Sequence, residues 1–335
     1  MKFATLFHCS LVSLMLCVSQ AARAEIGEVT IAKQYGVSYL PFMVMERDKL
    51  LEKHARNTGL GEVKVNWRTF AGGGVMNDAL ISGSLQFASA GVPPFATLWE
   101  KTKGNLNVKA VGAMSSLPSY LNTRNPAVKS IKDLSDTDRI ALPAVKVSNQ
   151  AIYLQMAAAK AFGIEHYNKF DKLTVTMSFV DGMAALLSGS SEINTQFVSP
   201  PYAQQQLEKP GIRNILNSYD VMGGPATLIV VYTTEAVQKA NPKTYAAFVS
   251  AFEEAITIVN RDKRAAADFY VRETKSRDSV ESVEKILNDP QVEFTMTPKS
   301  IATYTDFMAK VGSLKIKPTS WKDMFFPNAH GLPGS

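Results

Sequence analysis

Beyond residue 24 the chain contains no cysteine, since its two cysteines are Cys9 and Cys17. The rest of the chain therefore offers no disulfide, no thiol nucleophile and no cysteine ligand for a metal. Histidine is also scarce there: only His54, His166 and His330 occur, and none has the spacing of paired metal ligands. We expect no bound metal and no cofactor.

Motifs that mark common enzyme classes are missing as well. The run Gly72-Gly73-Gly74 lacks the third glycine of a dinucleotide-binding loop, and no Walker lysine follows it. No Gly-x-Ser-x-Gly sequence, the mark of an α/β-hydrolase nucleophile, occurs. A fold can still assemble catalytic groups from distant segments, but these absences favour a binding protein over an enzyme.

The chain has little net charge of either sign. It carries 36 Lys and Arg against 30 Asp and Glu, a formal net charge of +6 over 335 residues. This excess is too mild to indicate nucleic-acid binding, which needs a concentrated basic face. Long apolar runs are also missing after residue 24, so no segment there is predicted to span a bilayer.

The first 24 residues have the pattern of a secretory signal peptide. Lys2 supplies the positive start, residues 6–18 are mostly apolar, and Ala22-Arg23-Ala24 is a small-x-small cleavage site. Cleavage after Ala24 would remove both cysteines. Cys17 follows the bulky Leu16, whereas lipoprotein processing favours a small residue at that position. We therefore expect a soluble exported protein rather than a lipoprotein.

The rest of the chain alternates strand and helix patterns, which predicts parallel sheets covered by helices on both faces. The rhythm of strand, glycine, helix, strand and proline occurs twice, so we expect two similar lobes. The predicted strands are residues 29–33, 63–67, 85–88, 108–111, 139–142, 173–177, 193–198 and 228–232. The predicted helices are residues 41–59, 75–82, 151–162, 181–187, 242–259, 279–287 and 298–311, with Asp181 and Asn241 as caps of two of them.

Small polar residues or glycines recur where predicted strands end and helices begin. Four such places are residues 34–39, 72–74, 148–150 and 199–202. Ligands of open α/β sheets bind beyond the carboxyl ends of the strands, where helix N-termini can hold an anion without a charged side chain. Each place alone is most simply a turn, but their recurrence in both halves predicts a shared cleft.

Several of these segments also carry a family resemblance. Trp67 to Gly74 and Ala79 to Phe87 resemble the first cleft segment of the substrate-binding proteins of ABC importers, of the nitrate/sulfonate/taurine type with its thiamine-precursor-like relatives. Pro126 to Leu134 is similar to that family's entry into the second lobe, and Ser148 to Gln150 to its ligand loop. Trp321 to Phe326 resembles a common C-terminal ending. No single piece is specific, but their order is.

The resemblance implies a type II periplasmic-binding-protein fold, an α/β architecture of two lobes with mixed, mainly parallel sheets and a ligand cleft between them. The implied division is residues 25–117 for the first part of lobe I, 118–223 for lobe II and 224–335 for the rest of lobe I with the C-terminal helices. The ligand-binding residues that it implies are Gln34, Tyr35, Ser38, Tyr39, Gly73, Gly74, Gly91, Val92, Ser148, Asn149, Gln150, Ser199 and Pro200.

One position departs from the family pattern. Val198 and Ser199 stand where the family often has a Trp and an acid before the proline. Without that carboxylate a cationic ligand loses a partner, so an anionic ligand is favoured. Lys146 precedes the Ser148 loop and is either a solvated loop residue or a source of positive charge. Tyr202 and the tyrosines at 35 and 39 are candidates to face an aromatic ligand.

The resemblance implies a role as the periplasmic component of an importer. Its partners would be a small-molecule solute and an ABC permease with its ATPase, and we expect a monomer that binds no nucleic acid. An enzyme resembling the thiamine-pyrimidine synthases is one alternative, although those rely on a cysteine-rich motif and iron. A periplasmic ligand sensor for a receptor is another. Sulfonates, nitrate-like anions, carboxylates, aromatic acids and pyrimidines remain open as ligands.

Overall fold

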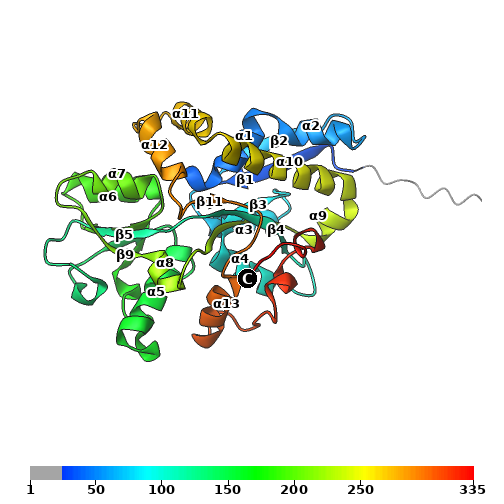
Figure 1. Cartoon of the computed structure of the whole chain (residues 1–335). Helices are drawn as coiled ribbons and strands as arrows, with labels where there is room; N and C mark the ends of the chain where they lie inside the picture. The colour runs from blue at the N-terminus through cyan, green and yellow to red at the C-terminus, as the bar shows by residue number, and fades with distance from the viewer. Residues whose placement is uncertain (1–24) are drawn as a thin grey trace, which may run out of the picture.

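The structure is a computed structural model that describes residues 25–335, in which two sheets lie side by side (Figure 1). The strand order of the first sheet places β10 between β3 and β4. A parallel bridge between Ile31 and Phe87 joins its two-stranded and four-stranded parts. The order is β2 (Lys64–Thr69), β1 (Glu28–Lys33), β3 (Ala88–Gly91), β10 (Thr227–Thr233), β4 (Lys109–Ser116) and β11 (Glu293–Phe294).

The second sheet repeats this arrangement with other strands. Its order is β7 (Thr174–Thr176), β6 (Ile140–Leu142), β8 (Thr195–Val198), β5 (Tyr120–Thr123) and β9 (Arg213–Asn217). In each sheet the fourth strand, β10 or β5, is antiparallel to both of its neighbours, and the remaining strands share one direction except β11, which is antiparallel to β4. The expected mixed and mainly parallel sheets are therefore present, each with a reversed strand at the same place.

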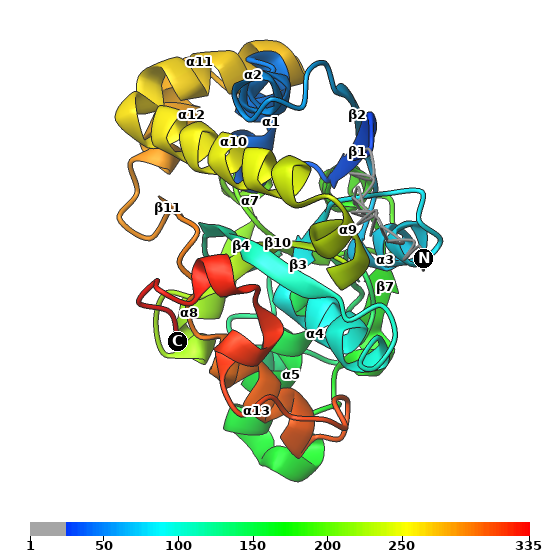
Figure 2. The same ribbon diagram turned by 90° about the vertical axis from the view of Figure 1, so that its right-hand side faces the viewer.

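Helices cover both faces of each sheet, as Figures 1 and 2 show. We call the first sheet with its helices lobe I and the second with its helices lobe II. One face of lobe I carries α1 (Leu40–Arg47), α2 (Leu50–Asn57), α10 (Pro242–Arg261), α11 (Lys263–Thr274) and α12 (Val280–Leu287). The other face carries α3 (Gly73–Ile81), α4 (Val92–Lys101) and α13 (Ile301–Lys310). The short helix α9 (Glu235–Ala240) follows β10. In lobe II, α6 (Phe179–Ser188) and α7 (Tyr202–Leu207) lie on one face and α5 (Asn149–Phe162) and α8 (Ser218–Met222) on the other.

The apolar core is continuous between the lobes on the side of α4, α5 and α13. Tyr153 of α5 and Tyr304 of α13 are fully buried there, with ring centroids 5.7 Å apart and their hydroxyls hydrogen-bonded to each other. The Tyr304 hydroxyl is also 2.9 Å from the carbonyl oxygen of Thr227 on β10. This packing joins α5 of lobe II to α13 and β10 of lobe I.

The chain passes between the sheets twice, after β4 and after α8. The boundaries expected at 117/118 and 223/224 fall in these two passages. As limits of units that move relative to each other, they remain a prediction.

Two predicted helix and strand limits were wrong for local reasons. The helix expected over 41–59 is interrupted at Lys49, whose left-handed backbone (φ 48°) separates α1 from α2. Pro93 and Pro94, expected to stop a strand, lie in the first turn of α4, where a missing N–H costs nothing. The strand expected at 85–88 accordingly runs later, over 88–91.

The two predicted caps do not make the expected side-chain bonds, although Asn241 does occupy the N-cap position of α10. The side chain of Ser178, rather than that of Asp181, accepts the capping hydrogen bond of α6. The Asn241 side chain accepts from the N–H of Ile26 and does not cap α10. Instead the Glu25 carboxylate accepts from the backbone N–H groups at the start of that helix.

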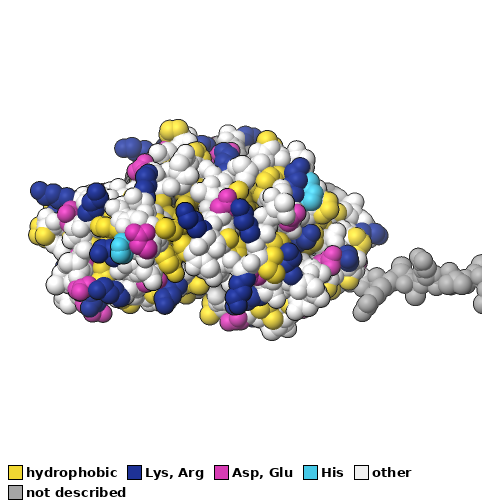
Figure 3. All heavy atoms as spheres, turned by 90° about the horizontal axis from the view of Figure 1, so that it is seen from below, with side chains coloured by type: hydrophobic (Ala, Val, Ile, Leu, Met, Phe, Trp, Pro, Cys, Tyr) yellow, Lys and Arg dark blue, Asp and Glu magenta, His cyan; other side chains and the backbone are white. Residues whose placement is uncertain are grey.

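Figure 3 shows one face of the molecule, on which basic and acidic side chains are interspersed with uncharged ones. No helix within residues 25–335 is both long enough and apolar enough to cross a membrane. The expected signal peptide at 1–24 lies outside the described residues.

Candidate functional site

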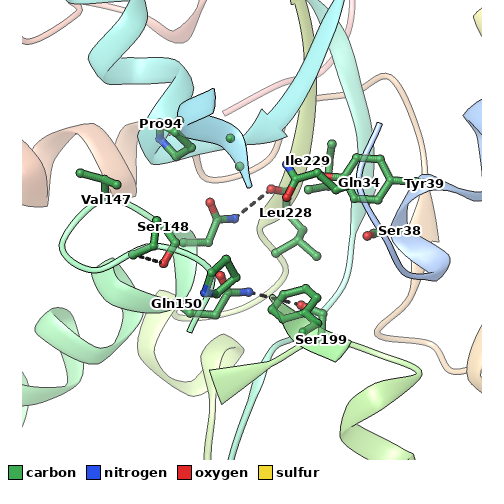
Figure 4. Close-up of a pocket in the computed structure, with 17 residues that line it drawn as sticks. Gln34, Ser38, Tyr39, Pro94, Val147, Ser148, Gln150, Ser199, Leu228 and Ile229 are labelled. Atoms are coloured by element: carbon green, nitrogen blue, oxygen red, sulfur yellow. Dashed lines mark hydrogen bonds between the residues drawn. The ribbon is translucent and has the colours of Figure 1, made fainter. Parts of the chain in front are cut away.

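A pocket lies between the lobes, at the ends of strands from both sheets (Figure 4). It encloses about 510 Å³ of empty space, including its open mouth. Lobe I contributes residues that follow β1 and β3, the first turn of α3, and the start of β10. Lobe II contributes the segment from β6 into α5, the start of α6 and the end of β8.

In lobe I the segment after β1 places three polar side chains in the pocket wall. Ser38 and Tyr39 are buried, with 3% and 2% of their surface exposed. The Gln34 amide donates 3.4 Å to the carbonyl oxygen of Ser89 at the neighbouring strand. Burial raises the pKa of Tyr39 well above its ordinary value, so this hydroxyl stays protonated at neutral pH.

In lobe II, the Ser148 side chain holds the start of α5, which forms part of the pocket wall. Its hydroxyl accepts from the N–H of Ala151 at 3.2 Å, an N-cap contact, and donates 2.7 Å to the carbonyl oxygen of Ala144. Both bonds hold the 143–148 segment against the helix. The Ser148 hydroxyl is therefore occupied within lobe II as well as lining the pocket.

Beside it, three buried polar side chains form a small network. The Gln150 amide donates to the hydroxyls of Ser119 at 3.1 Å and Ser199 at 3.4 Å, and the two hydroxyls lie 2.9 Å apart. Ser119 belongs to the passage from β4 to β5, so the network ties one connection between the lobes to the pocket wall.

Asn149 reaches across the pocket from lobe II to lobe I. Its side-chain nitrogen donates 2.8 Å to the carbonyl oxygen of Leu228 on β10 (Figure 4). Its side-chain oxygen has no hydrogen-bond partner among the described residues. Gly91 lies beside it: a Cβ added there would be 1.9 Å from the Asn149 oxygen.

The electrostatics of the pocket come from backbone groups. None of the described side chains that line it belongs to Lys, Arg, His, Asp or Glu. The first residues of three helices, Gly73 of α3, Asn149 of α5 and Phe179 of α6, all lie in its wall. Helix N-termini carry partial positive charge, so the pocket favours a negative or electron-rich group.

The structure brings most of the predicted ligand-binding residues together in this pocket. Those that line it are Gln34, Ser38, Tyr39, Gly73, Gly74, Gly91, Ser148, Asn149, Gln150 and Ser199. Three others do not line it: Tyr35 is 47% exposed, Val92 is buried in the core as the first residue of α4, and Pro200 turns its carbonyl oxygen towards Gly36. Lys146 is exposed and also lies outside the lining.

The pocket contains apolar lining residues that the sequence interpretation missed: Pro94, Pro143, Ala144, Val147, Phe179, Leu228 and Ile229. Pro143 and Ala144 directly follow a predicted strand, so the strand-end rule could have found them. Phe179 would have been found had Ser178 been recognised as the cap. The apolar run around Leu228 indicates a buried strand. Nothing in it indicates that the first residues of this strand line a cleft.

The comparisons with known proteins place this geometry in context. The model of the NMT1-like family matches residues 22–271. No curated protein sequence matches the chain. Among solved structures, the chain is similar to the alkanesulfonate-binding protein SsuA from Xanthomonas axonopodis pv. citri bound to MOPS, with 17% identity, a TM-score of 0.71, and coverage of 90% of this chain and 98% of that one.

Two further solved structures show the same similarity. The periplasmic aliphatic sulphonate binding protein SsuA from Escherichia coli has 17% identity and a TM-score of 0.65, with 91% of this chain and 99% of that one covered. The periplasmic nitrate-binding protein NrtA from Synechocystis PCC 6803 has 14% identity and a TM-score of 0.68, with 90% and 84% covered. At these identities the likeness establishes the fold. The chain therefore belongs to the NMT1-like family and has the fold of the periplasmic binding proteins.

Proposed function

We propose that this chain is the solute-binding component of an ABC importer, which captures a small organic solute between its lobes and presents it to a membrane permease and its ATPase. The observation that carries the proposal is the pocket between the lobes, lined from both sides by strand ends and helix starts. The family match and the solute-binding neighbours support it. In this role the chain is not an enzyme.

We place the protein in the periplasm, delivered there by the signal-like segment at residues 1–24. In that compartment a binding protein meets solutes before they reach the inner membrane. Lobe II (118–223) would close on lobe I (25–117 with 224–335) around the bound solute, and the permease would recognise the closed form. Closure requires that the solute binds the closed arrangement more tightly than the open one.

The lining suggests a solute with an anionic or electron-rich head and an apolar part. Helix starts and neutral polar groups of the lining such as the Ser38 hydroxyl suit the head. Apolar side chains such as those of Val147 and Phe179 also line the space. Exposed hydrophobic residues also adjoin the lining: Tyr35, Val75, Val145 and Val180 each follow a lining residue directly, and Val147 is itself part of the lining. Their exposed fractions range from 37% to 55%.

A thermal-shift screen tests the proposal directly. Sulfonates, nitrate, carboxylates, aromatic acids and pyrimidines would be compared against the protein alone. A solute present at about 100 times its dissociation constant stabilises the folded state by roughly 2.7 kcal/mol, which raises the melting temperature measurably. No shift with any of these classes would overturn the proposed role.

Two glutamines of α5 provide a matched pair for the same screen. Gln150 and Gln155 are both buried and both donate hydrogen bonds, but only Gln150 lines the pocket, whereas Gln155 pairs with Asp171. Gln150→Ala should abolish or weaken the shift given by a solute, and Gln155→Ala should retain it. Equal effects would mean that the solute binds elsewhere.

A further inference from the structure

Asn149 is the side chain through which lobe II reaches the strand at the centre of lobe I. It is the first residue of α5, only 3% exposed, and its amide nitrogen lies 2.8 Å from the carbonyl oxygen of Leu228. Leu228 belongs to β10, which runs between β3 and β4. The bond therefore spans the pocket from one lobe to the other rather than staying within one wall.

The Leu228 carbonyl fixes which way the Asn149 amide faces. A carbonyl oxygen only accepts, so the NH₂ group must face it and the side-chain oxygen must face Gly91. That oxygen occupies the space where a Cβ on residue 91 would be, at 1.9 Å. The backbone of Gly91 (φ −60°, ψ 159°) suits any residue, so glycine is required here for space and not for conformation.

We propose that Asn149, Gly91 and Leu228 form a clasp that holds the lobes closed. Asn149 approaches lobe I closely because residue 91 has no side chain, and it then bonds to Leu228. Asn149 is thus a positioning residue, which acts on solute binding by setting the fraction of closed protein. The clasp rests on the proposed closure of the two lobes, but not on the identity of the solute.

An inter-lobe distance measured by double electron–electron resonance tests the clasp. Spin labels would be placed at Asp78→Cys on α3 and Ala184→Cys on α6, which are exposed positions on the two sides of the pocket. Cys9→Ser and Cys17→Ser in the same chain leave these as the only two cysteines. The protein is measured without added solute, so the result does not depend on which solute it carries.

We expect a population at short distance in the parent chain. Gly91→Ala and Asn149→Ala should each lower the ratio of short-distance to long-distance protein by about threefold to tenfold, the equivalent of one lost hydrogen bond. The double variant should match Asn149→Ala alone, because both changes break the same contact. If the Gly91→Ala variant does not fold, the Asn149→Ala variant alone tests the clasp.

Two controls separate the clasp from general effects of substitution. Gly27→Ala adds a methyl group where nothing lies within 4 Å. Asn260→Ala removes a comparable bond, from a side-chain amide to the Phe294 carbonyl oxygen at 2.9 Å, that stays within lobe I. Both should keep the parent distance distribution.

A parent chain with only the long distance, or Gly91→Ala and Asn149→Ala variants with the parent distribution, would overturn the clasp. These results are distinguishable from failure of the proposed function, which the solute screen reports separately. If the variants shift the distance distribution as expected but the chain binds no solute, the clasp is supported and the importer role is refuted.

Discussion

The side-chain amide of Gln205 in α7 donates a 2.6 Å hydrogen bond to the carboxylate of Asp278, which lies between α11 and α12. This contact joins lobe II to lobe I at a further place, apart from the pocket lining and from the Tyr153–Tyr304 pair. Nearby, the ring of Tyr202 lies 3.7 Å from the position that a Cβ on Gly36 would take, so the lobes also pack together there.

Removing either partner of this bond should cost stability. We expect Gln205→Ala and Asp278→Ala each to lower the free energy of unfolding by roughly 1.5–3 kcal/mol, the range for a hydrogen bond to a charged group. Urea denaturation of both single variants and the double variant measures their coupling. Strictly additive losses would show that the two side chains do not act together.

Two serine caps should separate folding from binding. Ser148 caps α5 and lines the pocket, whereas Ser178 caps α6 and does not line it. Alanine at either position should lower stability by about 1 kcal/mol, the usual cost of losing an N-cap. Only Ser148→Ala should also weaken solute binding, as measured by calorimetry with a solute found in the screen. Equal affinities for both variants would exclude Ser148 from the binding site.

The cap that Glu25 provides for α10 should make stability depend on pH. Burial raises the pKa of Glu25, but hydrogen bonds from Thr244 and Lys243 outweigh it, so the pKa lies below the ordinary 4.5. A carboxylate whose pKa is lower in the folded than in the unfolded state stabilises the fold when the pH lies above its unfolded-state pKa. That contribution is lost as the pH falls through its folded-state pKa.

Glu25→Gln should therefore lower the free energy of unfolding at pH 7 by less than about 1 kcal/mol, a value kept small by solvent exposure. The difference from the parent should shrink as the pH falls below about 4.5. Glu62→Gln, at a side chain 82% exposed, serves as the control and should have little effect at any pH. A Glu25→Gln effect that stays constant with pH would contradict the role of the charge.

The apolar lining predicts how affinity depends on the length of the solute. In a series of straight-chain sulfonates, each added CH₂ that is buried against Val147 or Phe179 should improve binding by up to about 0.8 kcal/mol until the space is filled. Titration calorimetry measures the trend, with nitrate as the member that has no tail. Tightest binding of nitrate would show that the apolar residues do not contact the solute.

Local patterns in the sequence were sufficient for much of the framework. Short strand-like patterns of apolar residues located β1, β2, β6 and β7 to within one or two residues, and Ser279 stands as the N-cap of α12 where the expected helix began. The continuous apolar run at 228–232 marked a strand buried on both faces, and β10 is fully buried. These features depend on neighbours in sequence, which a periodic pattern records.

What the pattern could not show depends on residues far apart in the chain. β5 and β9 escaped notice because Tyr120–Thr123 and Arg213–Asn217 lack a distinctive alternation. They are held by tertiary pairing, β9 with β5 and β5 with both β9 and β8. The helix starts indicated where the pocket would lie. The bond from Asn149 to Leu228, across 79 residues, could not be read from either segment.

The place of β10 in the first sheet also limits the order in which the chain can fold. Lobe II draws all five strands from one continuous stretch, from Tyr120 to Asn217. In lobe I, β10 lies between β3 and β4, so the sheet cannot join these two early strands until the chain has been made as far as Thr233. The sheet whose strands are made first is thus among the last parts of the protein to be completed, and its unpaired strand edges are open to aggregation or to chaperones during that interval.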